Sequence, residues 1–175
     1  MKKKISLYSD NNFAFIDAQN LYLGVKNQKW EIDYARLRIL LKDKYKVKKA
    51  FLFIGYIAEN QDLYTHLQQC GFICVFKPTL PIKNKMTKQI TYKGNVDAEL
   101  VLEAVSQKDN YNKAVIITSD GDFACLIKFL VNNDKLEKLI TTHVRYSSLL
   151  RKYAEHITPI ATFKDKIKKE HSRKP

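Results

Sequence analysis

Residues 114–123 read Ala-Val-Ile-Ile-Thr-Ser-Asp-Gly-Asp-Phe. The apolar, β-branched start of this stretch predicts a strand that is buried on both faces, as in a parallel sheet. The Ser-Asp-Gly-Asp turn leads into residues 123–130, whose apolar side chains have helical spacing. Asp120 and Asp122 are therefore expected at the carboxyl end of a buried strand. Open α/β sheets place their ligands in the crevice at this edge.

Two further aspartates fall at comparable points of the chain. A strand expected over residues 12–17 ends at Asp17, and Asp97 opens a helix expected over residues 96–107. If both strands are central and parallel, all four carboxylates converge at one edge of the sheet. A single Asp at a helix start is most simply a helix cap. Capping does not account for Asp17, because this residue follows a buried strand.

Strand and helix patterns alternate along the chain. Strands are expected at about residues 12–17, 50–56, 72–76, 113–118 and 136–142, and helices at about 34–41, 59–69, 96–107, 122–132 and 147–154. A further short strand is expected at residues 89–93. This alternation predicts an α/β fold with a mainly parallel sheet covered by helices on both faces. The domain is expected to span residues 12–162, between a basic N-terminal arm (1–11) and a basic C-terminal tail (163–175).

The charge of the chain points to an anionic partner. The 175 residues carry a formal net charge of +13, which most simply indicates nucleic acid, although an anionic membrane surface or solubility alone are alternatives. Residues 63–96 contain no acidic residue. Between residues 77 and 93 this stretch has five lysines that are expected to guide phosphate groups: Lys77, Lys83, Lys85, Lys88 and Lys93.

Several classes of protein are disfavoured by the sequence. No apolar run approaches the roughly 20 residues of a membrane-spanning helix, and a membrane is not among the predicted partners. The basic start is not followed by the apolar region of a signal peptide. The three cysteines lack the spacing of metal ligands, and the expected location is cytoplasmic. No Gly-rich phosphate-binding loop or Gly-x-Ser-x-Gly motif is present.

The predicted cluster of carboxylates has the ligand chemistry of a hard metal ion. Carboxylates that gather in one cleft repel each other, and they stay ionised only beside a compensating cation or basic partner. Oxygen ligands without nearby His or Cys favour Mg²⁺ or Mn²⁺. Such an ion binds a phosphodiester oxygen and generates hydroxide from bound water. The sequence therefore predicts a metal centre that acts on a phosphodiester.

Three motifs, in this order and spacing, resemble the NYN domain, a branch of the PIN-like nucleases. They are Asp17-Ala-Gln-Asn20, Lys93-Gly-Asn-Val-Asp97 and Ser119-Asp-Gly-Asp122-Phe123. Residues 145–151, Arg-Tyr-Ser-Ser-Leu-Leu-Arg, are also similar to the bacterial LabA-like group of this family. The resemblance covers residues 12–162. It implies a PIN-like, Rossmann-like three-layer α/β/α sandwich with an acidic Mg²⁺ site that acts on RNA.

The resemblance also implies roles for single residues. By match of motif, Asp17, Asp97, Asp120 and Asp122 would be the catalytic, metal-binding carboxylates. Asn20 would orient the site, and Ser119 would contact phosphate or metal-bound water. Tyr92 offers a stacking surface for a base, although packing in the protein is the simpler role for a tyrosine.

The leading hypothesis is a Mg²⁺- or Mn²⁺-dependent ribonuclease, an endonuclease that hydrolyses RNA. The alternative is a non-catalytic RNA-binding or regulatory module on a PIN-like scaffold. A phosphatase with Asp17 as nucleophile is disfavoured, because Gln19 stands where such enzymes have a second Asp. A DNA nuclease stays open, since this chemistry does not require the 2′-hydroxyl. Whether the chain is a monomer or a homodimer is also open.

Overall fold

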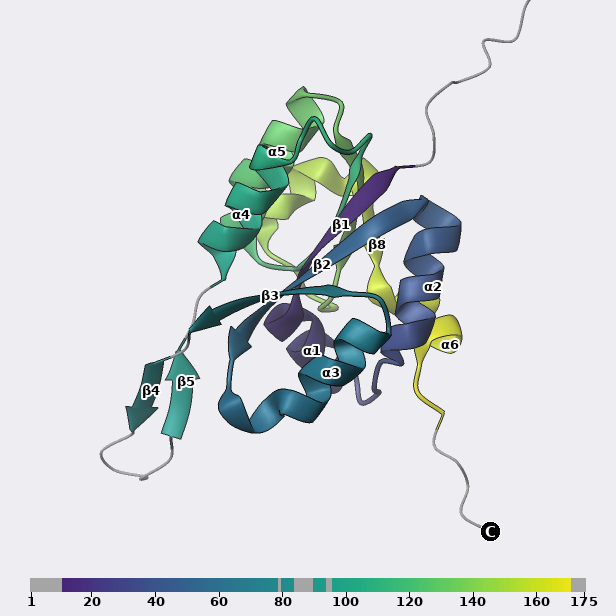
Figure 1. Ribbon diagram of the computed structural model, residues 1–175. Coiled ribbons are helices and arrows are strands. Elements are labelled where there is room, and N and C mark those ends of the chain that lie inside the picture. Colours follow the sequence, from purple (N-terminus) through teal and green to yellow (C-terminus); the bar gives the residue numbers. More distant parts are fainter. Residues whose placement is uncertain (1–10, 79, 84–89, 94–95, 171–175) are drawn as a thin grey trace, which may run out of the picture.

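A parallel sheet of six strands forms the centre of the molecule (Figure 1). The structure is a computed structural model that describes residues 11–78, 80–83, 90–93 and 96–170, with the backbone alone for 80–83 and 90–93. The strand order is β3-β2-β1-β6-β7-β8. Its members are β1 (Asn12–Asp17), β2 (Val47–Tyr56), β3 (Ile73–Pro78), β6 (Ala114–Ile117), β7 (Leu136–Thr141) and β8 (Ile157–Pro159). A separate antiparallel pair is formed by β4 (Leu80–Lys83) and β5 (Ile90–Lys93).

Helices cover both faces of the sheet. One face carries α1 (Ala18–Asn27), α2 (Tyr34–Tyr45), α3 (Gln61–Gln69), the 3₁₀ helix η4 (Ile160–Phe163) and α6 (Lys164–Ile167). The other face carries α4 (Asp97–Ser106), α5 (Ala124–Asn132) and the 3₁₀ helix η3 (Ser148–His156). Two short 3₁₀ helices, η1 (Ala58–Asn60) and η2 (Gly121–Phe123), follow β2 and β6. The predicted three-layer α/β/α fold is confirmed.

Strand β1 contributes to both hydrophobic cores because its side chains alternate between the two faces. Phe13 and Phe15 enter the core beneath α4 and α5, while Ala14 and Ile16 enter the core beneath α1 and α2. Phe15 stacks on Phe51 of β2, with 5.4 Å between the ring centroids. Burying each such side chain contributes roughly 1.5–3 kcal/mol. The strand that ends in Asp17 is therefore held firmly on both faces.

The strand order places a topological switch point between β1 and β6. The chain runs from β1 outward through β2 to β3, and then returns to the other side of β1 to form β6. The helices that follow these two strands leave toward opposite faces, α1 toward one and α5 toward the other. A crevice forms where such connections diverge, and ligands of open α/β sheets bind there.

Some element boundaries differ from the sequence prediction. Strand β2 begins three residues before the predicted start at residue 50, because Val47 is buried and pairs with Asn12. The helix predicted at residues 147–154 is a 3₁₀ helix, and the side chain of Ser147 caps it by accepting from the Leu149 N–H. Strand β8 was not predicted. No helix in the described ranges is both long enough and apolar enough to cross a membrane.

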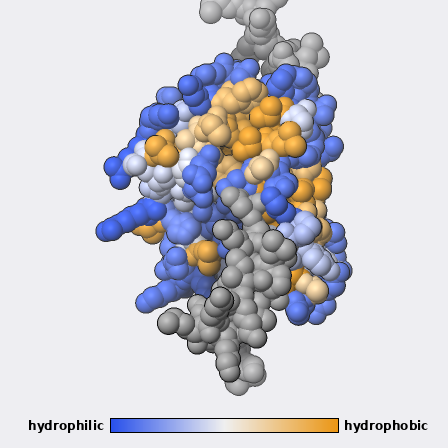
Figure 2. Space-filling view, turned by 90° about the vertical axis from the view of Figure 1, so that its left-hand side faces the viewer, coloured by the Kyte–Doolittle hydropathy of each residue, from blue (hydrophilic) through white to orange (hydrophobic). Residues whose placement is uncertain are grey.

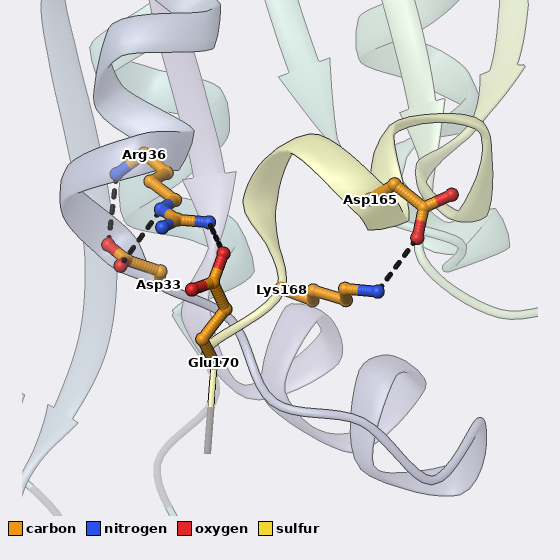
Figure 3. Close-up of polar contacts among 5 residues, drawn as sticks. All are labelled: Asp33, Arg36, Asp165, Lys168 and Glu170. Atoms are coloured by element: carbon orange, nitrogen blue, oxygen red, sulfur yellow. Dashed lines mark hydrogen bonds and ion pairs between the residues drawn. The ribbon is translucent and has the colours of Figure 1, made fainter. Parts of the chain in front are cut away.

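Residues 164–170, the last ones that the structure describes, pack against α2 (Figure 3). Arg36 Nη1 lies 2.9 Å from Glu170 Oε1, and Arg36 Nε lies 3.5 Å from Asp33 Oδ2. Lys168 pairs with Asp165 at 2.9 Å. The first residues of the predicted tail thus lie on the domain, and α6 buries Ile167 completely. The predicted division into arm, domain and tail stays a prediction.

Candidate functional site

Asp17 is the last residue of β1 and also the N-cap of α1. Its Oδ1 accepts a hydrogen bond from the Asn20 backbone N–H at 3.0 Å, and its Oδ2 accepts one from the Thr118 hydroxyl at 3.5 Å. The side chain is buried, with 6% exposure. The inference that capping does not account for Asp17 was wrong, because β1 passes into α1 without an intervening loop.

The pKa of Asp17 is raised to about 6. Burial is the main cause, since it penalises the charged form, and the negative charges of Asp97 and Asp120 raise the pKa further. The hydrogen bond from the Asn20 backbone acts in the opposite direction but is weaker. The carboxylate is therefore insufficiently compensated by its protein surroundings, and a cation beside it would favour the ionised form.

Among the described residues, Asp97, Asp120 and Asp122 each bring one carboxylate oxygen to within 4.8 Å of the others. Asp97 is the first residue of α4, and Asp120 is the N-cap of η2, where its Oδ1 accepts from the Asp122 N–H at 3.0 Å. The structure thus brings together three of the four predicted carboxylates. Asp17 is not part of this group, but it is close enough for two of its members to shift its pKa.

This donor set suits a hard divalent cation. Every offered ligand atom in the group is a carboxylate oxygen, which is the ligand type that Mg²⁺ and Mn²⁺ prefer. Asp122 is exposed, while Asp97 and Asp120 are half-buried, so the group is open to solvent on one side. The residues present fit such an ion, and an open side leaves room for water or a phosphate oxygen.

Asn20 and Ser119 fasten the ends of three neighbouring strands together. Asn20 Oδ1 accepts from the Ser119 backbone N–H at 2.8 Å and from the Thr142 hydroxyl. Ser119 Oγ accepts from the backbone N–H groups of Thr142 at 2.7 Å and His143 at 2.8 Å. These bonds join the start of α1 to the residues that follow β6 and β7. The predicted contact between Ser119 and phosphate stays a prediction, and Ser119 Oγ is buried among backbone donors.

Two threonines in this region were missed by the sequence reasoning. The Thr118 hydroxyl donates to the Asp17 carboxylate and accepts from the Asp120 backbone N–H at 3.1 Å, so it links the Asp17 side chain to the backbone of Asp120. Thr142 bonds both Asn20 and Ser119. Each threonine directly follows a buried strand. This is the one feature of the sequence that indicates a position at the carboxyl edge of the sheet.

The predicted phosphate-guiding lysines have mixed outcomes. Lys77 Nζ lies 2.9 Å from a carboxylate oxygen of Glu99 and holds the pKa of that carboxyl below its usual range. Lys77 is thus paired with a carboxylate of the protein itself. The other members of the predicted substrate-binding set lie outside the described residues or in strands whose side chains are not described: Lys83, Lys85, Lys88, Lys93 and Tyr92. Their roles stay predictions.

An open, apolar depression of about 490 Å³ adjoins Asp97 on the outer side of α4. It is lined by Ala98, Val101, Leu102 and Val105 in addition to Asp97, and Leu102 is 69% exposed. Figure 2 shows apolar residues gathered on this side of the molecule among charged ones. Apolar surface therefore lies directly beside one of the clustered carboxylates.

Comparison with known proteins agrees with the fold. A crystal structure of a protein of unknown function from Vibrio parahaemolyticus is similar to this chain, with a TM-score of 0.70 and 18% sequence identity. The match covers 93% of this chain and all of that one. No curated protein matches the chain. The family model of the NYN domain matches residues 13–161, which is most of the chain. The chain therefore belongs to the NYN family of PIN-like nuclease domains.

Proposed function

We propose that the chain is a metal-dependent ribonuclease, an endonuclease that hydrolyses RNA phosphodiester bonds. The observation that carries the proposal is the group of three carboxylates within 4.8 Å at the switch point of a NYN-family sheet. Membership of a nuclease-like family supports the reaction type. The formal net charge of +13 supports a polyanionic substrate.

Asp97, Asp120 and Asp122 would hold Mg²⁺ or Mn²⁺, and Asp17 would add a fourth negative charge from its buried position. When bound, the ion supplies Lewis acidity toward a phosphoryl oxygen and lowers the pKa of bound water. The protein's part is to hold the carboxylates in place. Asn20 and Ser119 do this by tying β1, β6 and β7 together at the edge where the acids lie.

The substrate would approach over the basic segment 77–93 and the apolar surface beside Asp97. Lys77 binds Glu99, so it would exchange this carboxylate for a phosphate when RNA arrives. An unpaired base next to the cleaved bond would find apolar surface along Val101 and Leu102. Such splayed bases are typical of single-stranded RNA, which is the substrate class that we propose.

A non-catalytic RNA-binding module is favoured by one observation. Asp17 and Asp120 each cap a helix, so two of the four carboxylates have a structural role that requires no metal. A protein without nuclease activity would keep them for that reason. Asp97 makes no cap, because Val96 holds that position and no side-chain cap bond is formed. The position of Asp97 beside the other two acids favours the enzyme.

Cleavage of labelled single-stranded RNA with Mg²⁺, Mn²⁺ or EDTA tests the proposal. Asp120→Asn keeps a cap acceptor but removes the charge, and it should abolish metal-dependent cleavage. Asp134→Asn is the matched control, because Asp134 is exposed and precedes β7 at the opposite edge of the sheet. Metal-dependent cutting that survives in Asp120→Asn would show that the carboxylate group is not the active site. Tight binding without cutting under any metal would favour the non-catalytic module.

A further inference from the structure

Both ends of the loop between β7 and η3, residues 142–147, are hydrogen-bonded to Ser119, the residue that precedes Asp120. Ser119 Oγ accepts from the N–H groups of Thr142 and His143 at 2.7 and 2.8 Å. The Ser119 carbonyl accepts from the Ser147 N–H at 3.2 Å. The two ends of the loop are therefore fixed to the same short segment that carries the clustered carboxylates.

Close packing at Gly121 strengthens this attachment. A Cβ atom at position 121 would lie 3.0 Å from Ser147 Cβ and 3.1 Å from Leu149 Cδ1, so only glycine leaves enough room without a shift. Gly121 stands between Asp120 and Asp122. The loop is thus seated directly on the turn that presents two of the proposed metal ligands.

Between its fixed ends, the loop projects two side chains into solvent. Val144 is 78% exposed, and Arg145 is exposed as well, whereas Tyr146 packs against the core beneath α4 and α5. Within the described residues, Arg145 makes no hydrogen bond or ion pair. By contrast, Arg36 pairs with Glu170, and Arg38 donates to the Lys48 carbonyl at 2.7 Å.

The sequence around Arg145 also contains no acidic residue. Residues 138–154 contain no Asp or Glu, and their cations include Arg145, Arg151 and Lys152. This acid-free stretch covers the end of β7, the loop and most of η3. The loop that carries Arg145 is therefore anchored at the edge where the carboxylates lie, and the guanidinium fork of an arginine suits bidentate binding of phosphate.

We propose that Arg145 binds a phosphate of the RNA strand next to the phosphodiester that the carboxylate group cleaves. This inference rests on the proposed function, and it makes Arg145 a substrate-positioning residue. It also gives the RNA a path across the β7–η3 loop, in addition to any contact with the 77–93 segment. Because both ends of the loop are anchored, phosphate binding would mainly order the Arg145 side chain and not the backbone of the loop.

Binding of labelled single-stranded RNA at several KCl concentrations tests this role. All variants carry Asp120→Asn and are measured in EDTA, so that no cleavage interferes. Arg145→Gln should lower the slope of log K against log salt by about 0.7, which corresponds to roughly fivefold weaker binding at about 0.1 M salt. Arg145→Lys keeps the charge and should keep the slope. Lys166→Gln is the control, because it removes one exposed cation from α6 on the other face.

Unchanged affinity and salt slope in Arg145→Gln would overturn the proposal, as would an equal loss in Lys166→Gln. Failure of the parent protein to bind RNA would overturn it too. Thermal unfolding should show equal stability for all the Arg145 variants, since the side chain makes no contact that the fold uses. The comparison does not require cleavage. If the parent cuts no RNA with any metal, the proposed activity fails while the role of Arg145 is still decided by binding.

Discussion

Replacing Asp17 by Asn is expected to stabilise the metal-free protein. The folded-state pKa of Asp17 is about 6, above the ordinary value of 3.8. Between these values the folded state binds more protons than the unfolded state, so the free energy of unfolding falls as the pH rises from about 4 to about 6 and then levels off. Above this range the ionised carboxylate destabilises the fold by about 3 kcal/mol.

Asparagine removes this cost but keeps the helix cap. The Oδ1 of asparagine can still accept from the Asn20 N–H. Its Nδ2 takes the place of Asp17 Oδ2, the oxygen that accepts from the Thr118 hydroxyl. Loss of that hydrogen bond costs about 1 kcal/mol. The net gain at pH 7 is therefore about 2 kcal/mol, which raises the Tm of a domain of this size by about 4–8 °C.

Thermal unfolding followed by circular dichroism, in EDTA between pH 4 and pH 8, measures the effect. The difference between Asp17→Asn and the parent should be small near pH 4, grow to about pH 6 and stay constant above it. Asp134→Asn should follow the parent throughout, because that side chain is 91% exposed. A variant that is less stable than the parent at pH 7, or a difference that does not depend on pH, would refute the reasoning.

Three further changes test other parts of the structure. Gly24→Ala should destabilise the protein by about 1–3 kcal/mol, seen as a lower Tm, because its Cβ would lie 2.6 Å from the Thr142 carbonyl oxygen. Ile167→Ala should cost about 2–5 kcal/mol in urea unfolding, since this side chain is fully buried; a loss below 1 kcal/mol would show that the C-terminal segment is not part of the core. Mn²⁺ at about 100 times its Kd should stabilise the parent by about 2.7 kcal/mol in thermal unfolding, and equal stabilisation of Asp120→Asn would place the ion elsewhere.

The order of strands and helices could be predicted where many consecutive side chains are apolar. Strand β6 is apolar at every position and completely buried, and β1 carries two phenylalanines and an isoleucine that are also buried. Strand β8 has only Ile157, Thr158 and Pro159, and its extended state comes from pairing with β7. No local pattern of three residues carries that information, because it depends on the neighbouring strand.

The candidate site also has one part that local sequence predicts and another part that depends on the order of the strands. The carboxylates were found because parallel strands bring their carboxyl ends to one edge, so residues that end strands can be placed without knowing the strand order. Thr118 and Thr142 required that order. Thr142 reaches Asn20 and Ser119 only because β7 lies beside β6, which in turn lies beside β1. The sequence marked residues 145–151 only by their resemblance to the LabA-like group, because the attachment of the loop around Arg145 to the turn after β6 depends on the same strand order.

Capping and metal binding do not compete as explanations for Asp17, because they make different demands on the residue. A helix cap requires only a side-chain oxygen, and Asn or Ser would cap about as well as Asp. Burial raises the pKa of Asp17 to about 6 together with the charges of Asp97 and Asp120, although the cap hydrogen bond from the Asn20 N–H acts to lower it. An ionisable residue at this position therefore destabilises the protein at neutral pH, and Asn would serve the fold better. The negative charge is useful only if something positive binds beside it, and the adjacent group of Asp97, Asp120 and Asp122 supplies the ligands for such an ion.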